Sequence, residues 1–189
     1  MKHSELLTIR KFIDSDPISG KIKAARFISV MAGGSESEII RESDADIVLQ
    51  TLILSLLNRG RYVDAATVLW PSTVFCAEPE SVQSVLSAVR EESTVLIMGA
   101  GAMGKTYTLA AWCVMDYIRD PEYTAFVLIS STKQHATSNL FSQIVKFFKS
   151  ACVPLPGKII SGYIGMFEHD KKAGIMQLSI PAGDDGKGR

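Results

Sequence analysis

The chain has few cysteines and no secretion signal. Its 189 residues include three cysteines, Cys76, Cys113 and Cys152, which are far apart and odd in number. That spacing indicates neither a disulfide framework nor a metal site, and it suits a reducing compartment. The N-terminus lacks the unbroken apolar core of a signal peptide. We therefore expect a cytoplasmic protein.

The chain also lacks a long apolar run and a net charge. Its most apolar stretch, residues 47–57, spans 11 residues and is interrupted by Gln50, Thr51 and Ser55. A run of that length is too short to cross a bilayer, so no membrane association is expected. Lys+Arg and Asp+Glu both number 20, so the whole chain has no basic signature of nucleic-acid binding. Residues 1–92 have 10 basic and 13 acidic side chains and residues 93–189 have 10 and 7, an asymmetry too mild to assign a partner.

The strongest pattern in the sequence is STVLIMGAGAMGKTY, residues 93–107. An apolar run at 94–98 predicts a strand, and the eight residues from Gly99 to Thr106 match the phosphate-loop pattern G-x-x-x-x-G-K-[ST]. Residues 107–118 are mostly good helix formers, so a helix N-terminus should follow the loop. The structural alternative is a Gly/Ala-rich turn that fits the pattern by chance.

The chemistry of phosphate binding explains these residue types. Gly99 and Gly104 provide backbone conformations and close approaches that a side chain would block. Lys105 would place its charge on the β and γ phosphates and is the candidate catalytic residue, and the Thr106 hydroxyl would ligate Mg²⁺. The expected cofactors are thus ATP and Mg²⁺. The predicted binding residues of the loop and helix start are Gly99, Ala100, Gly101, Ala102, Met103, Gly104, Lys105, Thr106 and Tyr107.

Residues 1–75 read as a helical accessory region. Helices are expected at 4–13, 20–31, 43–59 with Ser43 as N-cap, and 61–70. The third is apolar on more than one face, so it is either central to a helical subdomain or covered by a partner. The region either packs without chemistry or provides a docking surface.

A further helix is expected at 78–92, with Pro79 in its first turn. Val82, Val85, Leu86 and Val89 follow the i, i+3, i+4, i+7 pattern of an amphipathic helix. Gln83 in this helix is a candidate adenine-binding residue, since its amide offers both a donor and an acceptor. The alternative is a solvated glutamine on the polar face.

The sequence after the loop predicts an α/β domain over residues 76–189. Residues 124–130 form a continuous apolar run, typical of a strand buried on both faces of a parallel sheet. Residues 131–135 should then lie on the phosphate-loop side, with His135 as a surface or capping residue. An apolar stripe at 140–148 predicts a helix, and 159–167 and 175–180 predict strands. The expected fold is a P-loop NTPase core with a parallel sheet flanked by helices.

One catalytic element is missing from the sequence. A P-loop ATPase needs a second strand that ends in acidic residues, which help to hold Mg²⁺ and orient water. The late candidates are Asp184 and Asp185, but Pro181 and Gly183 interrupt the strand before them. We expect that the chain ends before the acidic strand is made. The core would then be truncated and the chain alone inactive as an ATPase.

From about residue 70 onward, the chain resembles the ATPase domain of large terminase subunits, the DNA-packaging motors of tailed bacteriophages. The aromatic-proline stretch 70–75 and the Gln83 helix look like the family's adenine-side motif, and the phosphate loop begins 16 residues after Gln83. The run VLISSTKQHATSNLFSQIVKFF at 127–148 is similar to the strand, polar turn and helix that come next in the family. The tail GDDGKGR at 183–189 looks like the Gly-rich approach to the acidic strand.

This resemblance implies an ATP-driven motor that packages double-stranded DNA. It further implies a small terminase subunit and a portal as partners, a homo-oligomer in the complete motor, and the host cytoplasm as its location. Another nucleic-acid-translocating ATPase, such as a helicase, shares the phosphate loop. A nucleotide-binding module that never hydrolyses is a third hypothesis. A small-metabolite kinase is a fourth, although no Arg-rich lid segment is evident.

Overall fold

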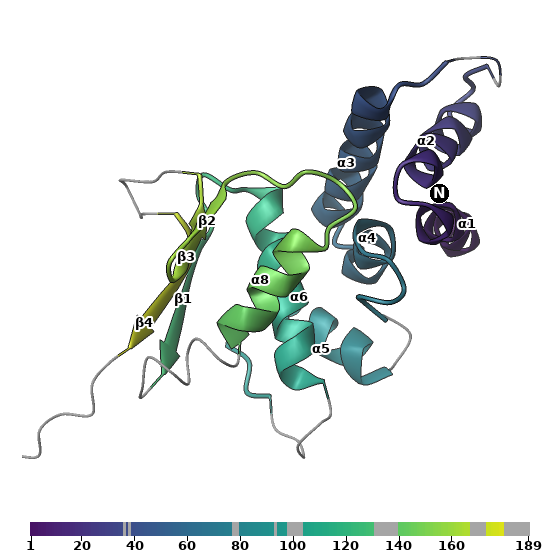
Figure 1. Ribbon diagram of the computed structural model, residues 1–189. Helices are drawn as coiled ribbons and strands as arrows, with labels where there is room; N and C mark the ends of the chain where they lie inside the picture. Colours follow the sequence, from purple (N-terminus) through teal and green to yellow (C-terminus); the bar gives the residue numbers. More distant parts are fainter. Residues whose placement is uncertain are drawn as a thin grey trace, which may run out of the picture. The chain divides into compact units, whose positions relative to one another are not determined.

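The computed structural model describes residues 1–35, 37, 39–76, 80–92, 94–97, 104–130, 140–166 and 173–179, with the backbone alone at 130 and 179. These residues form an α/β protein (Figure 1). In chain order, the elements are α1 (His3–Ser15), α2 (Ser19–Met31), α3 (Glu42–Asn58), α4 (Tyr62–Leu69), α5 (Glu80–Glu91), α6 (Lys105–Arg119), β1 (Ala125–Ser130), α8 (Ser142–Lys149), β2 (Lys158–Ile160), β3 (Tyr163–Gly165) and β4 (Gly174–Ser179).

The chain divides into two compact units. The first comprises Met1–Leu96 with Ser150–Leu155, and the second comprises Ile97–Lys149 with Pro156–Arg189. Packing thus divides the chain near residue 96. The domain boundary expected between residues 75 and 76 stays a prediction.

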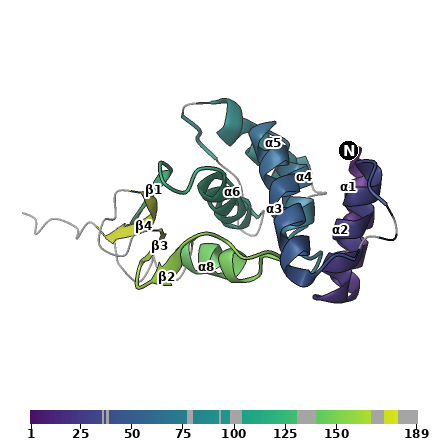
Figure 2. The same ribbon diagram turned by 90° about the horizontal axis from the view of Figure 1, so that it is seen from above.

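The first unit is helical. α1 packs on α2 and on α4, and α3 packs on both α2 and α4, as Figures 1 and 2 show. Burial of the apolar stripe of each helix makes this core, since removing apolar area from water stabilises the fold by about 25 cal/mol per Å². Its fully buried large side chains are Leu6, Ile9, Leu49, Ile53, Leu57, Leu69, Trp70, Phe75 and Leu86. The helices expected before residue 70 are confirmed.

The N-cap expected for α3 is wrong. The helix begins at Glu42 with Arg41 as N-cap, and Ser43 lies in its first turn. Glu42 and Asp44 place negative charge at the positive end of the helix dipole, so acidic residues stabilise this start. The Ser43 hydroxyl is 3.4 Å from a carboxylate oxygen of Asp44.

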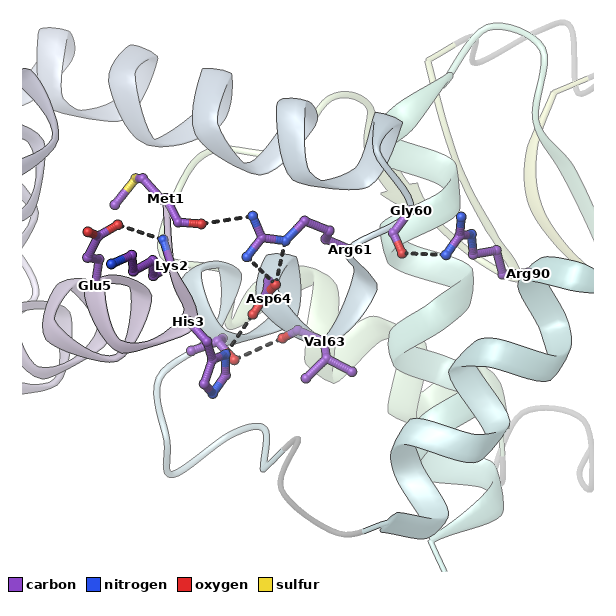
Figure 3. Close-up of polar contacts among 10 residues, drawn as sticks. Met1, Lys2, His3, Glu5, Gly60, Arg61, Val63, Asp64 and Arg90 are labelled. Atoms are coloured by element: carbon purple, nitrogen blue, oxygen red, sulfur yellow. Dashed lines mark hydrogen bonds and ion pairs between the residues drawn. The ribbon is translucent and has the colours of Figure 1, made fainter. Parts of the chain in front are cut away.

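Polar contacts join the chain start to α4. His3 Nδ1 lies 2.7 Å from Oδ1 of Asp64. The other Asp64 oxygen accepts from the Arg61 guanidinium at 2.6 Å, and Arg61 also donates to the Met1 carbonyl at 2.9 Å (Figure 3). These contacts link the start of the chain to the start of α4, although exposed pairs of this kind contribute little stability each.

α5 begins at Glu80 and buries Val82 and Leu86, which confirms the helix expected over this stretch. Arg90 near its C-terminus donates to the Gly60 carbonyl at 3.2 Å (Figure 3). Gly60 has φ +69°, and a Cβ there would lie 2.3 Å from the Arg90 side chain. The left-handed φ angle favours glycine at this position, whereas the flexible end of the Arg90 side chain can move away from a Cβ. Pro79 lies outside the described residues.

The second unit contains a four-stranded mixed sheet. The strand order is β1-β4-β3-β2. β1 and β4 are parallel, from the pair Ala125 and Gly174 to the pair Ser130 and Ser179, while β3 is antiparallel to both β4 and β2. The expected parallel sheet is confirmed only for β1 and β4. The single strand expected at 159–167 is instead a tight hairpin, because Gly162 with φ +72° allows the chain to reverse.

Helices α6 and α8 pack on each other, and Figures 1 and 2 show both on the same side of the sheet. Trp112 of α6 meets Phe126 of β1 edge-on, with ring centroids 5.0 Å apart. Val127 and Ile129, on the opposite sheet face, are 46% and 64% exposed. The expectation that β1 is buried on both faces is therefore wrong, and the strand alternates like a sheet with one covered face.

The strand expected at 94–98 is wrong over its described part. Residues 94–97 have no regular secondary structure, and the Leu96 side chain is 83% exposed. An apolar run becomes a strand only where a neighbouring strand completes its backbone hydrogen bonds. In the described sheet, the partner of β1 is β4 and not residues 94–97.

Candidate nucleotide-binding site

The described part of the phosphate-loop motif is the start of α6. Gly104 is the N-cap of this helix, with φ +73° and ψ 9° in the left-handed region. A Cβ at Gly104 would have no atom within 4 Å, so glycine is favoured here by conformation rather than by space. The Gly104 carbonyl accepts from the Thr108 backbone N–H at 2.8 Å and from its hydroxyl at 3.0 Å. The second glycine of the motif therefore sets the turn into the helix.

Lys105, Thr106 and Tyr107 form the first turn of α6. Their backbone N–H groups point out of the helix N-terminus, where the helix dipole favours an anion. Lys105 is half-buried and Thr106 is exposed. The geometry at this end of α6 fits a phosphate, with a lysine charge and an accessible hydroxyl beside the N–H groups.

The rest of α6 anchors this turn. The buried residues of this helix include Thr108, Ala111, Val114 and Met115. The Tyr107 ring packs edge-on against Phe147 of α8, with centroids 5.0 Å apart. This packing holds the first turn of α6 in place, so its N–H groups have a fixed direction.

Cys113, which is buried, and Cys152, which is half-buried, both have thiols with raised pKa values. Burial raises the pKa of Cys113, in α6, to about 12. Burial likewise raises the pKa of Cys152 to about 12, and its thiol donates to the Val68 carbonyl at 3.0 Å. Thiols with such pKa values are neutral near pH 7 and act as small apolar groups in the core.

The structure brings together only part of the predicted site. Gly104, Lys105, Thr106 and Tyr107 are consecutive at the start of α6. Gln83 is exposed on α5, which belongs to the first compact unit. The predicted residues outside the described part of the chain are Gly99, Ala100, Gly101, Ala102, Met103, His135, Asp184 and Asp185.

The aromatic-proline stretch before α5 has a structural role. Trp70 and Phe75 are fully buried, and their rings lie 5.4 Å apart at 49°. These rings are therefore part of the helical core and are not exposed to a nucleotide base.

Two polar residues of α1 hold this stretch, and the sequence analysis missed both. The Arg10 guanidinium donates to the Phe75 carbonyl, and Asp14 accepts from the Ser72 N–H at 3.0 Å. Arg10 is 8% exposed and follows the same stripe as the buried Leu6 and Ile13. An arginine within an apolar helical stripe was the signal that could have identified it.

Within the described residues, no group of three or more His, Cys, Asp or Glu side chains could hold a metal ion. The expected Mg²⁺ would come with the nucleotide and would bind Thr106, so this observation does not bear on it. Among the helices of the described residues, none combines the length and apolarity needed to span a bilayer.

A scan of protein-family models, a search of curated proteins and a search of solved structures each found no match to this chain.

Proposed function

We propose that this chain binds Mg-ATP at the N-terminus of α6. The observation that carries the proposal is the left-handed Gly104 N-cap followed by Lys105 and Thr106 in the first helical turn. A phosphate at this point would gain the helix dipole and the backbone N–H groups. The preceding residues complete the spacing G-x-x-x-x-G-K-T, which supports the same assignment.

Each residue has a defined part in this proposal. The Lys105 ammonium group would neutralise charge on the β and γ phosphates, and Thr106 would ligate the Mg²⁺ that accompanies them. Gly104 lets the backbone turn into the helix without a Cβ between the chain and the ligand. Gln83 would contribute a donor and an acceptor to the adenine edge.

At the level of the whole protein, we propose the ATP-binding part of a large terminase subunit. The order of the aromatic-proline stretch, the Gln83 helix, the phosphate loop and the run 127–148 supports this proposal. DNA, a small terminase subunit, a portal and other copies of the chain would then be its partners. Another nucleic-acid-translocating ATPase is an alternative, and so is a binding module without turnover, because the sequence contains no apolar run followed directly by Asp-Glu.

The first experiment measures nucleotide affinity in a Lys105→Ala variant. The loss of a charge-assisted contact to phosphate is worth roughly 1.5–3 kcal/mol, so affinity should fall about 10- to 100-fold. Titration with a fluorescent ATP analogue in Mg²⁺ gives the dissociation constants. Lys149→Ala, at an exposed lysine of α8, is the matched control and should bind like the parent. Equal affinity in the Lys105→Ala variant and the parent would contradict the site.

A further inference from the structure

We propose that a groove between α1 and α2 binds a peptide segment of a partner protein that presents an apolar side chain flanked by carboxylates. This groove belongs to the helical unit and is independent of the nucleotide site. Its cavity has a volume of about 340 Å³. That is near the lower end of the range for ligand sites and is large enough for one or two side chains.

The floor of the groove is apolar and comes from two helices. Phe12 of α1 and Phe27 of α2 meet edge-on, with ring centroids 6.1 Å apart at 62°. Val30 extends the apolar surface along α2. With Lys23 and Arg26, the α2 residues follow the spacing i, i+3, i+4, i+7, so they share one face of the helix.

The rim of the groove is positive. Lys23 and Arg26 are both exposed, and neither forms an ion pair with a carboxylate of the described residues. By contrast, the nearby Lys21 pairs with Asp46 at 2.9 Å. Charge complementarity therefore favours carboxylates on the ligand.

The acidic residues nearest the groove are already engaged. Hydrogen bonds from the backbone N–H groups of Ser19 and Ile18 hold the pKa of Asp16 below its usual value, with a smaller effect of Lys23. Asp14 accepts from the Ser72 N–H at 3.0 Å. Asp14 lies in the last turn of α1 and Asp16 follows the helix, and both would repel any anionic ligand, so they do not decide between a carboxylate and a phosphate.

The arrangement of the groove favours a peptide over a nucleic-acid strand. Single-strand binding requires a track of cations beside stacking rings, and this groove has two cations at one side of an apolar floor. A helix that docks in a groove uses apolar anchors at i, i+3 and i+4, with charges at the edge. The groove has room for one or two such anchors, with Lys23 and Arg26 at its edge.

The test uses the full chain and a fluorescein-labelled amphipathic helix. The peptide has Leu and Phe anchors at i, i+3, i+4 and i+7 and Glu at its polar positions, and a counterpart has Lys in place of every Glu. Fluorescence anisotropy should show saturable binding of the Glu peptide and none of the Lys peptide. In the double variant Lys23→Glu with Arg26→Glu, affinity for the Glu peptide should fall at least about tenfold, and the Lys peptide should now bind.

The matched control carries the same change of charge on exposed residues outside the groove, Arg59→Glu with Lys158→Glu. It should alter affinity less than about twofold, because screening limits distant charges. Phe27→Ala should weaken the Glu peptide while circular dichroism confirms the helical fold. Lys105→Ala should leave peptide binding unchanged, which separates this site from the nucleotide site.

Several results would overturn the proposal. The Glu peptide could fail to bind, both peptides could bind equally, or the control pair could lose as much affinity as the groove pair. Displacement of the Glu peptide by a poly-dT oligonucleotide at lower concentration would assign the groove to nucleic acid instead.

Discussion

At the scale of single residues, Gly104 decides whether the chain can turn into α6. Its φ of +73° is one that residues with a Cβ adopt only at a cost of roughly 1–2 kcal/mol. No atom lies within 4 Å of the Cβ position, so the penalty of a substitution is conformational and not steric. The backbone conformation alone therefore favours glycine at position 104, whether or not a ligand binds.

This leads to a graded prediction for Gly104. Gly104→Ala should lower the free energy of unfolding by about 1 kcal/mol, Gly104→Asn by less, and Gly104→Val by more, since Asn tolerates the left-handed region and β-branched residues do not. Urea denaturation followed by circular dichroism gives these values. Equal stability of the Val and Asn variants would show that the turn relaxes and that the φ angle is not enforced.

Gln83 provides a second prediction at this scale. If its amide binds the adenine edge, Gln83→Ala should weaken ATP binding more than GTP binding, because only the contact to the base is lost. One neutral hydrogen bond is worth about 1 kcal/mol, or roughly fivefold in affinity. Competition titrations with both nucleotides measure the ratio. If the affinities for ATP and GTP fell equally, or if neither fell, Gln83 would not bind the adenine base.

At the scale of elements, side chains of α1 hold residues 71–75 through two hydrogen bonds, an arrangement called here the α1 clamp. Arg10 and Asp14 are one turn apart on α1 and bond the Phe75 carbonyl and the Ser72 N–H. Together they hold an irregular segment, in which the Val74 and Phe75 N–H groups also donate to the Pro71 carbonyl.

The clamp can be tested with Arg10→Met, which keeps most of the side-chain volume. Removing the guanidinium leaves the Phe75 carbonyl without this donor, a loss of roughly 1–3 kcal/mol, partly offset because a buried charge is also removed. The neighbouring exposed Lys11→Met should change stability by less than about 0.5 kcal/mol. Chemical denaturation compares the two. An Arg10→Met variant as stable as the parent would show that desolvation of the guanidinium cancels its hydrogen bond.

Local sequence patterns did not predict the topology of the sheet. Gly174 begins β4 with φ +117°, and a Cβ there would lie 2.4 Å from the Ile164 carbonyl oxygen. The Tyr163 ring packs over this glycine, and its hydroxyl donates to the Ala173 carbonyl at 2.7 Å. The antiparallel β3–β4 pair thus depends on a close backbone approach that only glycine permits.

At the scale of the whole molecule, the question is whether binding leads to turnover. A positioned carboxylate that orients water typically contributes about 10²–10⁴-fold, and an arginine finger about 10³–10⁵-fold more. No apolar run followed by Asp-Glu occurs in the sequence. We therefore predict that this chain binds Mg-ATP weakly and hydrolyses it at or near the background rate.

Phosphate release should be measured on the purified chain with and without double-stranded DNA. Asp185→Asn serves as the paired variant. Sustained turnover near about one per second that disappears in Asp185→Asn would place a catalytic carboxylate in the tail and would contradict the prediction.

The sequence by itself determined the helices and the motif. The spacing of Val82, Val85, Leu86 and Val89 predicted α5, and the Gly-Lys-Thr at 104–106 located the start of α6. Helical periodicity and the φ requirement of a glycine are local properties, so they are written in a few consecutive residues.

Only the tertiary structure decided which apolar runs became strands and which aromatic residues became core. Residues 94–97 and β1 have similar β-forming composition, yet only β1 gained a partner ladder. Strand pairing joins residues distant in sequence, and no local pattern specifies the neighbour. The burial of Trp70 and the hydrogen bond from Arg10 to the Phe75 carbonyl were likewise decided by tertiary packing. Both depend on α1 packing against α4, a contact between segments some 60 residues apart that periodicity cannot encode.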